Sequence, residues 1–409
     1  MLDFSSIKRR EAKMEKDIKL QVITSALYQR SIKNVSKNPN VRLSHEFSHV
    51  IPYDVEPLEQ HRTGTCWLQA ACTFLCMRAK MNGITFKPSI AYLMYYDKLE
   101  RAVVFLHRIT QTNLDDRTKY HLLEEPISDG GSWSMFVFLI KKYGIVPFET
   151  YPQTYQAKNT KQLNYILNTY LRNTNVDDIK KNMSLHIEKV HEILTACLSL
   201  PPNNIVLTKE KNGVDFNGTP QSLFIRLRID LNFTCFQHAP TKIEGEKYVI
   251  YQSNDHTNME QHCFHAVNLD VLKKMTVECL ELNIPVWFTA NVGGGADFSR
   301  KLMECNAIDY ELLFDIGHTN SKEYLMERRS VKPSHAMLFI GVHCDNGKPV
   351  RWKVQNSWGK KTAFLTMSEK WFNNNVFEIA IPFDISHKFV SHKPPIHLAP
   401  WDILSTVAM

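Results

Sequence analysis

Two parts of this 409-residue chain carry chemically complementary side chains, although most of its length separates them. Residues 60–67, QHRTGTCW, contain a glutamine and a cysteine. Residues 334–338, SHAML, and residues 352–359, WKVQNSWG, contain a histidine and an asparagine. If these side chains act together, the fold has to bring an early segment against a late one. The site would then lie in a cleft between two halves of the molecule.

The cysteine and the histidine suit hydrolysis through a thiolate. A thiol of ordinary pKa is mostly protonated at neutral pH, and a nearby imidazole that takes its proton converts it into a nucleophile. We therefore predict that Cys66 is the nucleophile and that His335 is its base. The glycine and threonine before Cys66, and the apolar run LQAACTFL after it, predict that Cys66 opens a buried helix whose N-terminus favours an anion.

Three further residues have supporting roles in this prediction. The amide oxygen of Asn356 can orient the imidazole by accepting from its second nitrogen, and Trp358 can shield that bond from water. Gln60 stands six residues before Cys66 and can aim its amide, together with the Cys66 backbone N–H, at the oxyanion that forms on the substrate. We predict no cofactor and no metal at this site.

These segments resemble the papain-like C1 cysteine peptidases, and specifically their bleomycin hydrolase and aminopeptidase C branch. In papain the histidine follows the cysteine by roughly 130 to 150 residues, whereas His335 follows Cys66 at about twice that interval. The excess implies a large insertion between the two halves, as in that branch. Other matching segments are YDKLERAVVFL from Tyr96, DGGSWSMFVFLIKKYGIVP from Asp129, PVWFTANVG from Pro285, SEKWFNNNVFEI from Ser368 and the terminal LAPWDILSTVAM.

The resemblance implies an α+β, papain-like fold with two lobes, one helical and one barrel-like and rich in strands. Alternation in VWFTANV, AMLFIGVHC and VRWKVQN predicts strands of the second lobe. We expect residues 1–35 to form one amphipathic basic helix packed on the core through Ile18, Val22 and Leu27. The predicted parts are an N-terminal helical extension (1–49), a helical catalytic lobe with the nucleophile (50–150), a mostly helical insertion for oligomerisation (151–265), a β-rich catalytic lobe with the histidine and asparagine (266–392), and a C-terminal arm in the active-site cleft (393–409).

The end of the chain narrows the expected activity. In this branch a C-terminal arm enters the cleft and its carboxylate pairs with the free amino group of the substrate, so the resemblance implies this role for Met409. If the arm is trimmed by the enzyme itself, Met409 is the residue removed. Gly130 and Gly131 have no side chains and are expected to let a substrate approach the backbone. The sequence thus predicts a cysteine aminopeptidase that acts through a thioester on peptides with a free N-terminus, and on related amides.

Two other patterns could hold a metal. Residues 45–49, HEFSH, match HExxH, in which two histidines bind zinc and the glutamate acts as base. Pro39 and Pro52 limit this segment to a short helix, and no third ligand stands at a recognised spacing, so a surface turn is the stronger interpretation. The second pattern consists of His256, His262, Cys263 and His265. Its spacing is not that of a zinc finger, and we interpret it as a polar loop that leads into a strand.

Composition adds expectations about compartment and partners. The N-terminus lacks an apolar signal stretch, and the nine cysteines are scattered, which favours the cytoplasm and no membrane association. The net charge of +7 comes from dispersed basic pairs, which we interpret as solvated surface. An alternative hypothesis is a catalytically silent papain-fold module that binds protein or, weakly and without sequence specificity, nucleic acid. The resemblance further implies a homo-hexamer.

Overall fold

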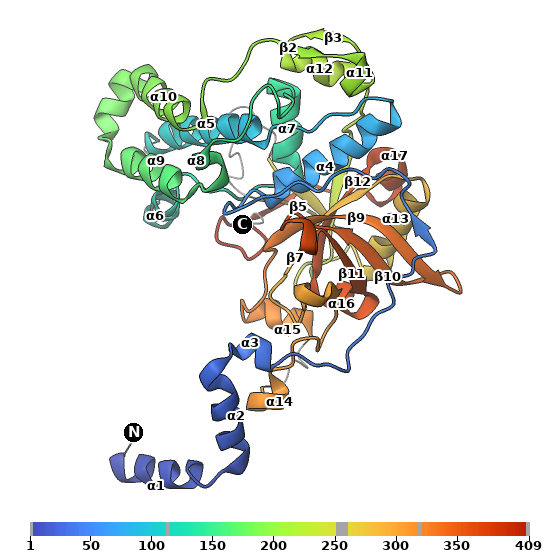
Figure 1. The fold of residues 1–409 in the computed structure, drawn as a ribbon. Helices are drawn as coiled ribbons and strands as arrows, with labels where there is room; N and C mark the ends of the chain where they lie inside the picture. Colours follow the sequence, from blue (N-terminus) through green and yellow to red (C-terminus); the bar gives the residue numbers. More distant parts are fainter. Residues whose placement is uncertain (1–2, 112–114, 251–260, 317–320, 406–409) are drawn as a thin grey trace.

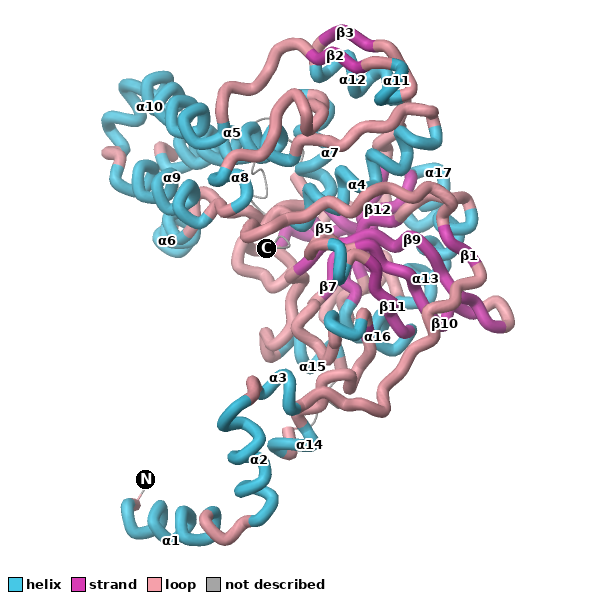
Figure 2. The backbone as a smooth tube through the Cα atoms, viewed as in Figure 1, coloured by secondary structure: helices cyan, strands magenta, loops and turns pink. Residues whose placement is uncertain are grey.

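A computed structural model describes residues 3–111, 115–250, 261–316 and 321–405. Helices are stacked above one large sheet, and the N-terminal segment extends away from both (Figure 1). Figure 2 shows that the strands of this sheet gather in one part of the body, with most of the long helices and a separate pair of short strands on the other side. This mixed content agrees with the predicted α+β class.

Three buried helices form the centre of the helical lobe: α4 (Cys66–Met81), α5 (Ile90–Ile109) and α7 (Trp133–Tyr143). Side-chain oxygens cap two of them, because Ser89 accepts from the N–H of Tyr92 and Ser132 accepts from the N–H of Met135. Helix α4 is buried on almost every face. A helix that is apolar around its circumference is expected in such an interior position. Helix α6 (Asp116–Glu124) contacts α5.

Residues 155–227 form further helices and a small hairpin. These elements are α8 (Tyr155–Lys158), α9 (Lys161–Asn173), α10 (Val176–Leu198), β2 (Ile205–Leu207), α11 (Lys209–Asn212), β3 (Phe216–Gly218) and α12 (Pro220–Leu227). Helix α9 buries Leu163, Leu167 and Leu171 at four-residue spacing, which is the stripe of an amphipathic helix. Helix α10 packs against α5, so this region is joined to the helical lobe.

An eleven-stranded sheet forms the rest of the body, in the order β13-β5-β6-β4-β12-β7-β9-β10-β11-β8, with β1 beside β9. Its strands are β1 (His49–Val50), β4 (Phe233–Gln237), β5 (Lys247–Ile250), β6 (Cys263–Ala266), β7 (Val286–Ala290), β8 (Leu302–Met303), β9 (His335–Asp345), β10 (Lys348–Gln355), β11 (Phe364–Ser368), β12 (Val376–Pro382) and β13 (Ile396–Leu398). Strands β7, β9 and β10 coincide with the alternating segments of the sequence. Strands β4, β5 and β6 lie within the range expected to be a mostly helical insertion; they are short, and their pairing with one another and with β12 decides their structure.

Shorter helices connect the strands. They are α13 (Leu269–Glu281), α14 (Glu311–Phe314), α15 (Lys322–Glu327), α16 (Glu369–Asn375), α17 (Phe383–Ser386), and the 3-10 turns η1 (Phe298–Arg300), η2 (Lys360–Thr362) and η3 (His387–Phe389). Helix α13 packs on β9 and β12. Across the described ranges, none of the helices combines the length and the apolar character needed to cross a membrane.

The single N-terminal helix packed on the core was a wrong prediction. Residues 4–35 form three helices: α1 (Phe4–Met14), α2 (Ile18–Gln29) and α3 (Ile32–Val35). Asp17 and Ser31 interrupt the run because their side chains cap α2 and α3. Helices α1 and α2 project away from the body (Figure 1), and Ile18 and Val22 are 75% and 64% exposed. Helix α3 lies against the body, where Lys33 stands over the Phe298 ring. The apolar spacing therefore predicted helical structure here, but it did not predict whether these helices pack against the rest of the chain.

Candidate active site

Cys66 is the first residue of α4, and its side chain is fully buried. Thr65 occupies the cap position, but its side chain makes no capping hydrogen bond, so the first amide groups of the helix are not covered by it. The backbone N–H of Ala336, the second residue of β9, donates to Cys66 Sγ over 3.4 Å. The thiol therefore lies where the helix of one lobe meets a strand of the other.

His335 and Asn356 come together because they end adjacent antiparallel strands. His335 begins β9, Asn356 follows β10 directly, and Leu338 faces Gln355 across the two strands. His335 Nε2 lies 2.8 Å from Asn356 Oδ1. An amide oxygen accepts only, so Nε2 carries the proton and Nδ1 keeps its lone pair. The Trp358 ring stacks on the imidazole at a centroid distance of 4.3 Å.

Burial shifts the pKa values of Cys66 and His335 in opposite directions. It raises the pKa of the Cys66 thiol to about 11, although backbone N–H groups of Ala336, Trp67 and Cys66 partly offset it. It lowers the pKa of His335 to about 4, against the opposing effect of the bond to Asn356. Both directions favour a neutral thiol and a neutral imidazole in the resting site. Transfer of one proton from the thiol to the imidazole would leave the net charge of the pair unchanged.

Gln60 is held beside the same strand end. Its backbone N–H donates to the carbonyl of Ser357 over 2.9 Å, and its Oε1 accepts from Ser357 Oγ over 2.9 Å. Its Nε2 donates to the carbonyl of Thr63 over 2.7 Å. An amide nitrogen has two hydrogens, and this bond uses one of them. The structure thus brings Gln60, Cys66, His335, Asn356 and Trp358 into the seam between the lobes.

The predicted substrate contacts Gly130 and Gly131 are buried, and both have structural duties. Arg101 Nη2 donates to the carbonyl of Gly130. A Cβ added to Gly131 would lie 2.2 Å from the Trp67 ring, so the indole requires the glycine. Their contact with a substrate stays a prediction.

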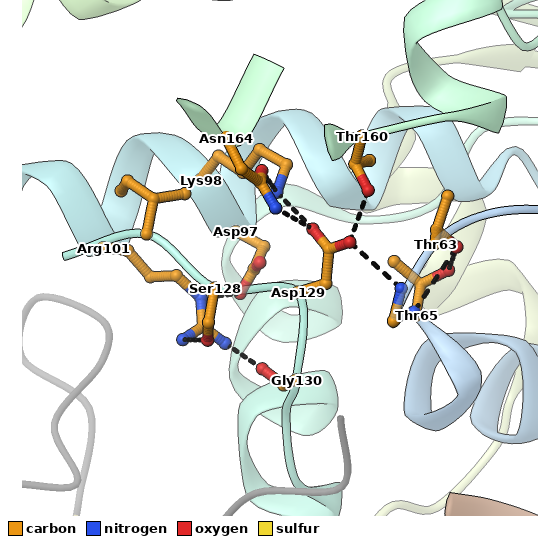
Figure 3. Close-up of polar contacts among 12 residues, drawn as sticks. Thr63, Thr65, Asp97, Lys98, Arg101, Ser128, Asp129, Gly130, Thr160 and Asn164 are labelled. Atoms are coloured by element: carbon orange, nitrogen blue, oxygen red, sulfur yellow. Dashed lines mark hydrogen bonds and ion pairs between the residues drawn. The ribbon is translucent and has the colours of Figure 1, made fainter. Parts of the chain in front are cut away.

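Asp129, directly before this glycine pair, organises a buried polar network that the sequence analysis missed (Figure 3). One carboxylate oxygen accepts from Lys98 Nζ over 2.7 Å and from Asn164 Nδ2 over 2.9 Å. The other accepts from the N–H of Gly64 over 3.0 Å and from the Thr160 hydroxyl. The carbonyl of Asp129 also accepts from the Trp67 indole, at 2.7 Å. The network therefore ties the loop before Cys66 to α5 and to α9.

The charge of Asp129 is stabilised by these partners. Burial alone would raise the pKa of this carboxyl, but the Lys98 ammonium and the hydrogen bonds from Gly64 and Thr160 lower it well below its usual value. The Lys98 side chain has no exposed surface, and the Asp129 side chain is 12% exposed. A lysine on the buried face of α5 and an acid next to two glycines were the signals in the sequence, but only the fold shows that they pair.

The HExxH interpretation is contradicted. Residues 41–47 have no helical structure, and His49 lies in β1, paired with Val342 of β9. His45 Nδ1 is 2.6 Å from the Thr366 hydroxyl. Zinc binding by this motif needs the two histidines one turn apart on a helix, whereas an extended backbone separates residues four positions apart by about 13 Å. Edge pairing with β9 explains why the expected short helix does not form.

The second metal pattern is also rearranged. His256 lies outside the described residues, whereas Cys263 and His265 belong to β6 and His262 precedes it. Within the described ranges, the side chains grouped closely enough to hold a metal are Cys235, His262 and Glu378, all of them buried. His262 Nε2 lies 3.2 Å from Glu378 Oε2. Cys235 and Glu378 are far from His262 in sequence, so no local motif could reveal this group.

The C-terminal arm returns to the same region. Strand β13 pairs in parallel with β5, and Leu404 is buried at 2% exposure. Leu404 and Gly131 line one cavity. Asp402 forms an ion pair with Lys242 at 2.8 Å, which holds the arm near its end. Met409, whose carboxylate was predicted to meet the substrate, lies outside the described residues.

Comparison with known proteins identifies this arrangement. The sequence matches the Peptidase C1-like family over residues 1–405. It is 28% identical to Aminopeptidase C of Listeria monocytogenes, covering 100% of this chain and 99% of that protein. It is 27% identical to Bleomycin hydrolase of Mus musculus, with 89% of each chain covered. Its fold matches PepW of Lactobacillus rhamnosis HN001 with a TM-score of 0.89 and 24% identity, covering 100% of this chain and 99% of that one. The chain therefore belongs to the Peptidase C1-like family and, within the papain-like cysteine peptidases, to the branch of aminopeptidase C and bleomycin hydrolase.

Proposed function

We propose that this cysteine aminopeptidase releases N-terminal residues from peptides and related amides through a thioester on Cys66. The observation that carries the proposal is the bond from His335 Nε2 to Asn356 Oδ1, at 2.8 Å, beside a thiol at the start of a buried helix. This bond leaves Nδ1 of the imidazole as the proton acceptor. The curated relatives named above carry the names of an aminopeptidase and a hydrolase.

The reaction proceeds in two halves. His335 takes the thiol proton while Cys66 Sγ attacks the carbonyl carbon of the scissile amide, and the resulting oxyanion accepts from the Cys66 N–H and from Gln60 Nε2. The C–N bond breaks as His335 returns its proton to the leaving amine, which produces the thioester. A water then loses a proton to His335 and attacks the thioester carbon. The C–S bond breaks, the sulfur regains the proton, and the released residue leaves as an acid.

The arm supports removal of single residues from the N-terminus. Leu404 is buried in the cavity that also contains Gly131, so the chain itself occupies space on the side of the cleft where a longer substrate would extend. Pairing of the substrate's ammonium with the terminal carboxylate of Met409 remains part of this proposal. The cytoplasmic location also remains part of the proposal, and nine free cysteines agree with it. The hexamer is a further part of the proposal, which the exposed apolar residues of α1 and α2 favour.

The test is hydrolysis of fluorogenic aminoacyl amides with and without an N-terminal acetyl group. Cys66→Ala should abolish turnover, whereas Cys72→Ala, which alters another buried cysteine of α4, should retain it. Iodoacetamide should inactivate the enzyme and a zinc chelator should not. Turnover that survives Cys66→Ala would refute the proposal. A well-folded protein without turnover on any amide would favour the silent binding module instead.

A further inference from the structure

A cavity of about 20 Å³, partly open to solvent, lies near the catalytic residues. Its volume is enough for one water-sized group. Gly131 and Pro333 line it, and Pro333 stands two residues before His335. Trp287 lines it too, and its indole donates to the carbonyl of Trp67, the neighbour of Cys66. Leu404 of the C-terminal arm lines it as well. The cavity therefore lies beside the segments that carry Cys66 and His335, and a small group of a bound substrate fits in it.

Three neighbouring strands supply most of its polar lining, to which Ser132 and His262 also contribute. On β12, Glu378 faces Gln237 of β4 on one side and Thr289 of β7 on the other, as direct register partners. Residues directly opposed on adjacent strands present their side chains to the same face of a sheet. All three line the cavity and are at least 95% buried. They form an acidic row, which we define as Gln237, Glu378 and Thr289.

Two members of the acidic row have unused hydrogen-bonding atoms. Gln237 Oε1 and Thr289 Oγ1 are buried and have no hydrogen-bond partner among the residues that the structure describes. The orientation of Gln237 is set by its other end, because its Nε2 donates to Glu378 Oε2. Leaving such a group buried and unpaired is unfavourable, because it has lost its hydrogen bonds to water. A ligand that donates hydrogen bonds would remove this cost.

We propose that the acidic row binds an ammonium group of the substrate. An ammonium has three donors and no acceptor. The row offers matching acceptors in the Gln237 amide oxygen, the Thr289 hydroxyl and the Glu378 carboxylate, which also supplies the opposite charge. The inference rests on the proposed function, because the cavity is a substrate site only if the adjoining thiol acts on a substrate.

A metal ion suits the same place less well. His262 Nδ1 is 3.0 Å from the Ser134 hydroxyl, and its Nε2 faces Glu378 Oε2 at 3.2 Å, so both ring nitrogens already have partners. The unpaired atoms are an amide oxygen and a hydroxyl, which are weaker ligands for zinc than thiolate or imidazole. An ammonium uses these atoms without displacing the histidine.

The ammonium can come from two parts of a substrate. One is the α-amino group of its first residue, in which case the acidic row binds it in place of the terminal carboxylate of Met409. The other is the side chain of a lysine, in which case the α-amino group stays with Met409. Binding to Cys66→Ala separates this question from turnover. The probes are norleucinamide, which has only the α-ammonium, and Nα-acetyl-lysinamide, which has only the side-chain ammonium. Each is titrated by calorimetry against Cys66→Ala and against Cys66→Ala combined with Glu378→Gln or Thr289→Val.

At least one probe should bind Cys66→Ala and lose about tenfold or more in affinity with Glu378→Gln, since a hydrogen bond to a charged group contributes about 1.5–3 kcal/mol. Thr289→Val should weaken the same probe. Thr276→Val, a buried threonine of α13 outside the cavity, is the matched control and should leave binding unchanged. The probe affected identifies the source of the ammonium.

Three results would overturn the inference. The first is binding of one or both probes that neither Glu378→Gln nor Thr289→Val weakens. The second is no binding of either probe to folded protein. The third is zinc that copurifies in stoichiometric amount and is lost with Cys235→Ser. Failure of the proposed function would appear separately, as lack of turnover by the wild-type enzyme.

Discussion

Asp129→Asn tests whether the buried network holds the active site together. The substitution keeps the size of the side chain and removes its charge. In the wild type, one oxygen accepts from Lys98 and Asn164 and the other accepts from Gly64 and Thr160. Asparagine has one acceptor oxygen and one donor nitrogen, so one of these two pairs of donors must face an N–H group.

The expected loss of stability is large because the pair is inaccessible to water. Lys98 has no exposed side-chain surface, and removing one partner of a buried ion pair costs about 3–5 kcal/mol. Activity should fall as well, because Gly64, whose N–H the carboxylate holds, lies two residues before Cys66. A loop displacement that weakens transition-state contacts by about 1.4 kcal/mol lowers the rate tenfold.

The assay is urea unfolding followed by tryptophan fluorescence, combined with kcat/KM on an unblocked aminoacyl amide. Asp315→Asn is the matched control: it removes the partner of Lys19 in an exposed pair, with side chains 82% and 54% exposed, and should cost less than about 1 kcal/mol. Folding lowers the pKa of Asp129, so its contribution to the stability of the fold is fully present above the unfolded pKa near 4. This stability is lost as the pH falls through the lower pKa of the folded state. A loss below about 1 kcal/mol for Asp129→Asn, with unchanged kcat/KM, would refute the reasoning.

Two further predictions concern the catalytic pair and the glycines beside it. Burial lowers the pKa of His335 to about 4, and a protonated imidazole cannot accept the thiol proton. On the acid side, kcat/KM should therefore fall only as the pH drops through about 4. A fall in kcat/KM near pH 6.5 in a pH–rate profile would contradict this prediction. Gly131→Ala should destabilise the protein by about 1–3 kcal/mol in urea unfolding, because its Cβ would meet the Trp67 ring at 2.2 Å. Gly293→Ala, where the nearest atom is a side-chain oxygen at 3.3 Å, is its control, and equal stability of the two variants would be evidence against the clash.

Residues with a chemical reason to act together were predictable without the fold. Cys66, His335 and Asn356 are distinguished by reactivity and by short local patterns, and the structure brings them together. Strands β7, β9 and β10 were predictable because each is a run that contains β-branched or aromatic residues. The alternation expected of β7 and β9 is not seen in their burial, because β7 is buried at every residue and β9 at its first eight. These features depend on side-chain chemistry and on near neighbours, and both can be read in order along the chain.

Contacts between distant segments were decided only by tertiary structure. The HEFSH segment resembles a zinc helix, yet pairing with β9 makes its end a strand. Residues 4–35 have helical apolar spacing, but the rest of the described chain buries no residue of their three helices. The ion pair of Lys98 with Asp129 and the row of Gln237, Glu378 and Thr289 join residues from separate elements. Such groups leave no local pattern, because burial and strand register, which the whole fold sets, determine which polar atoms meet.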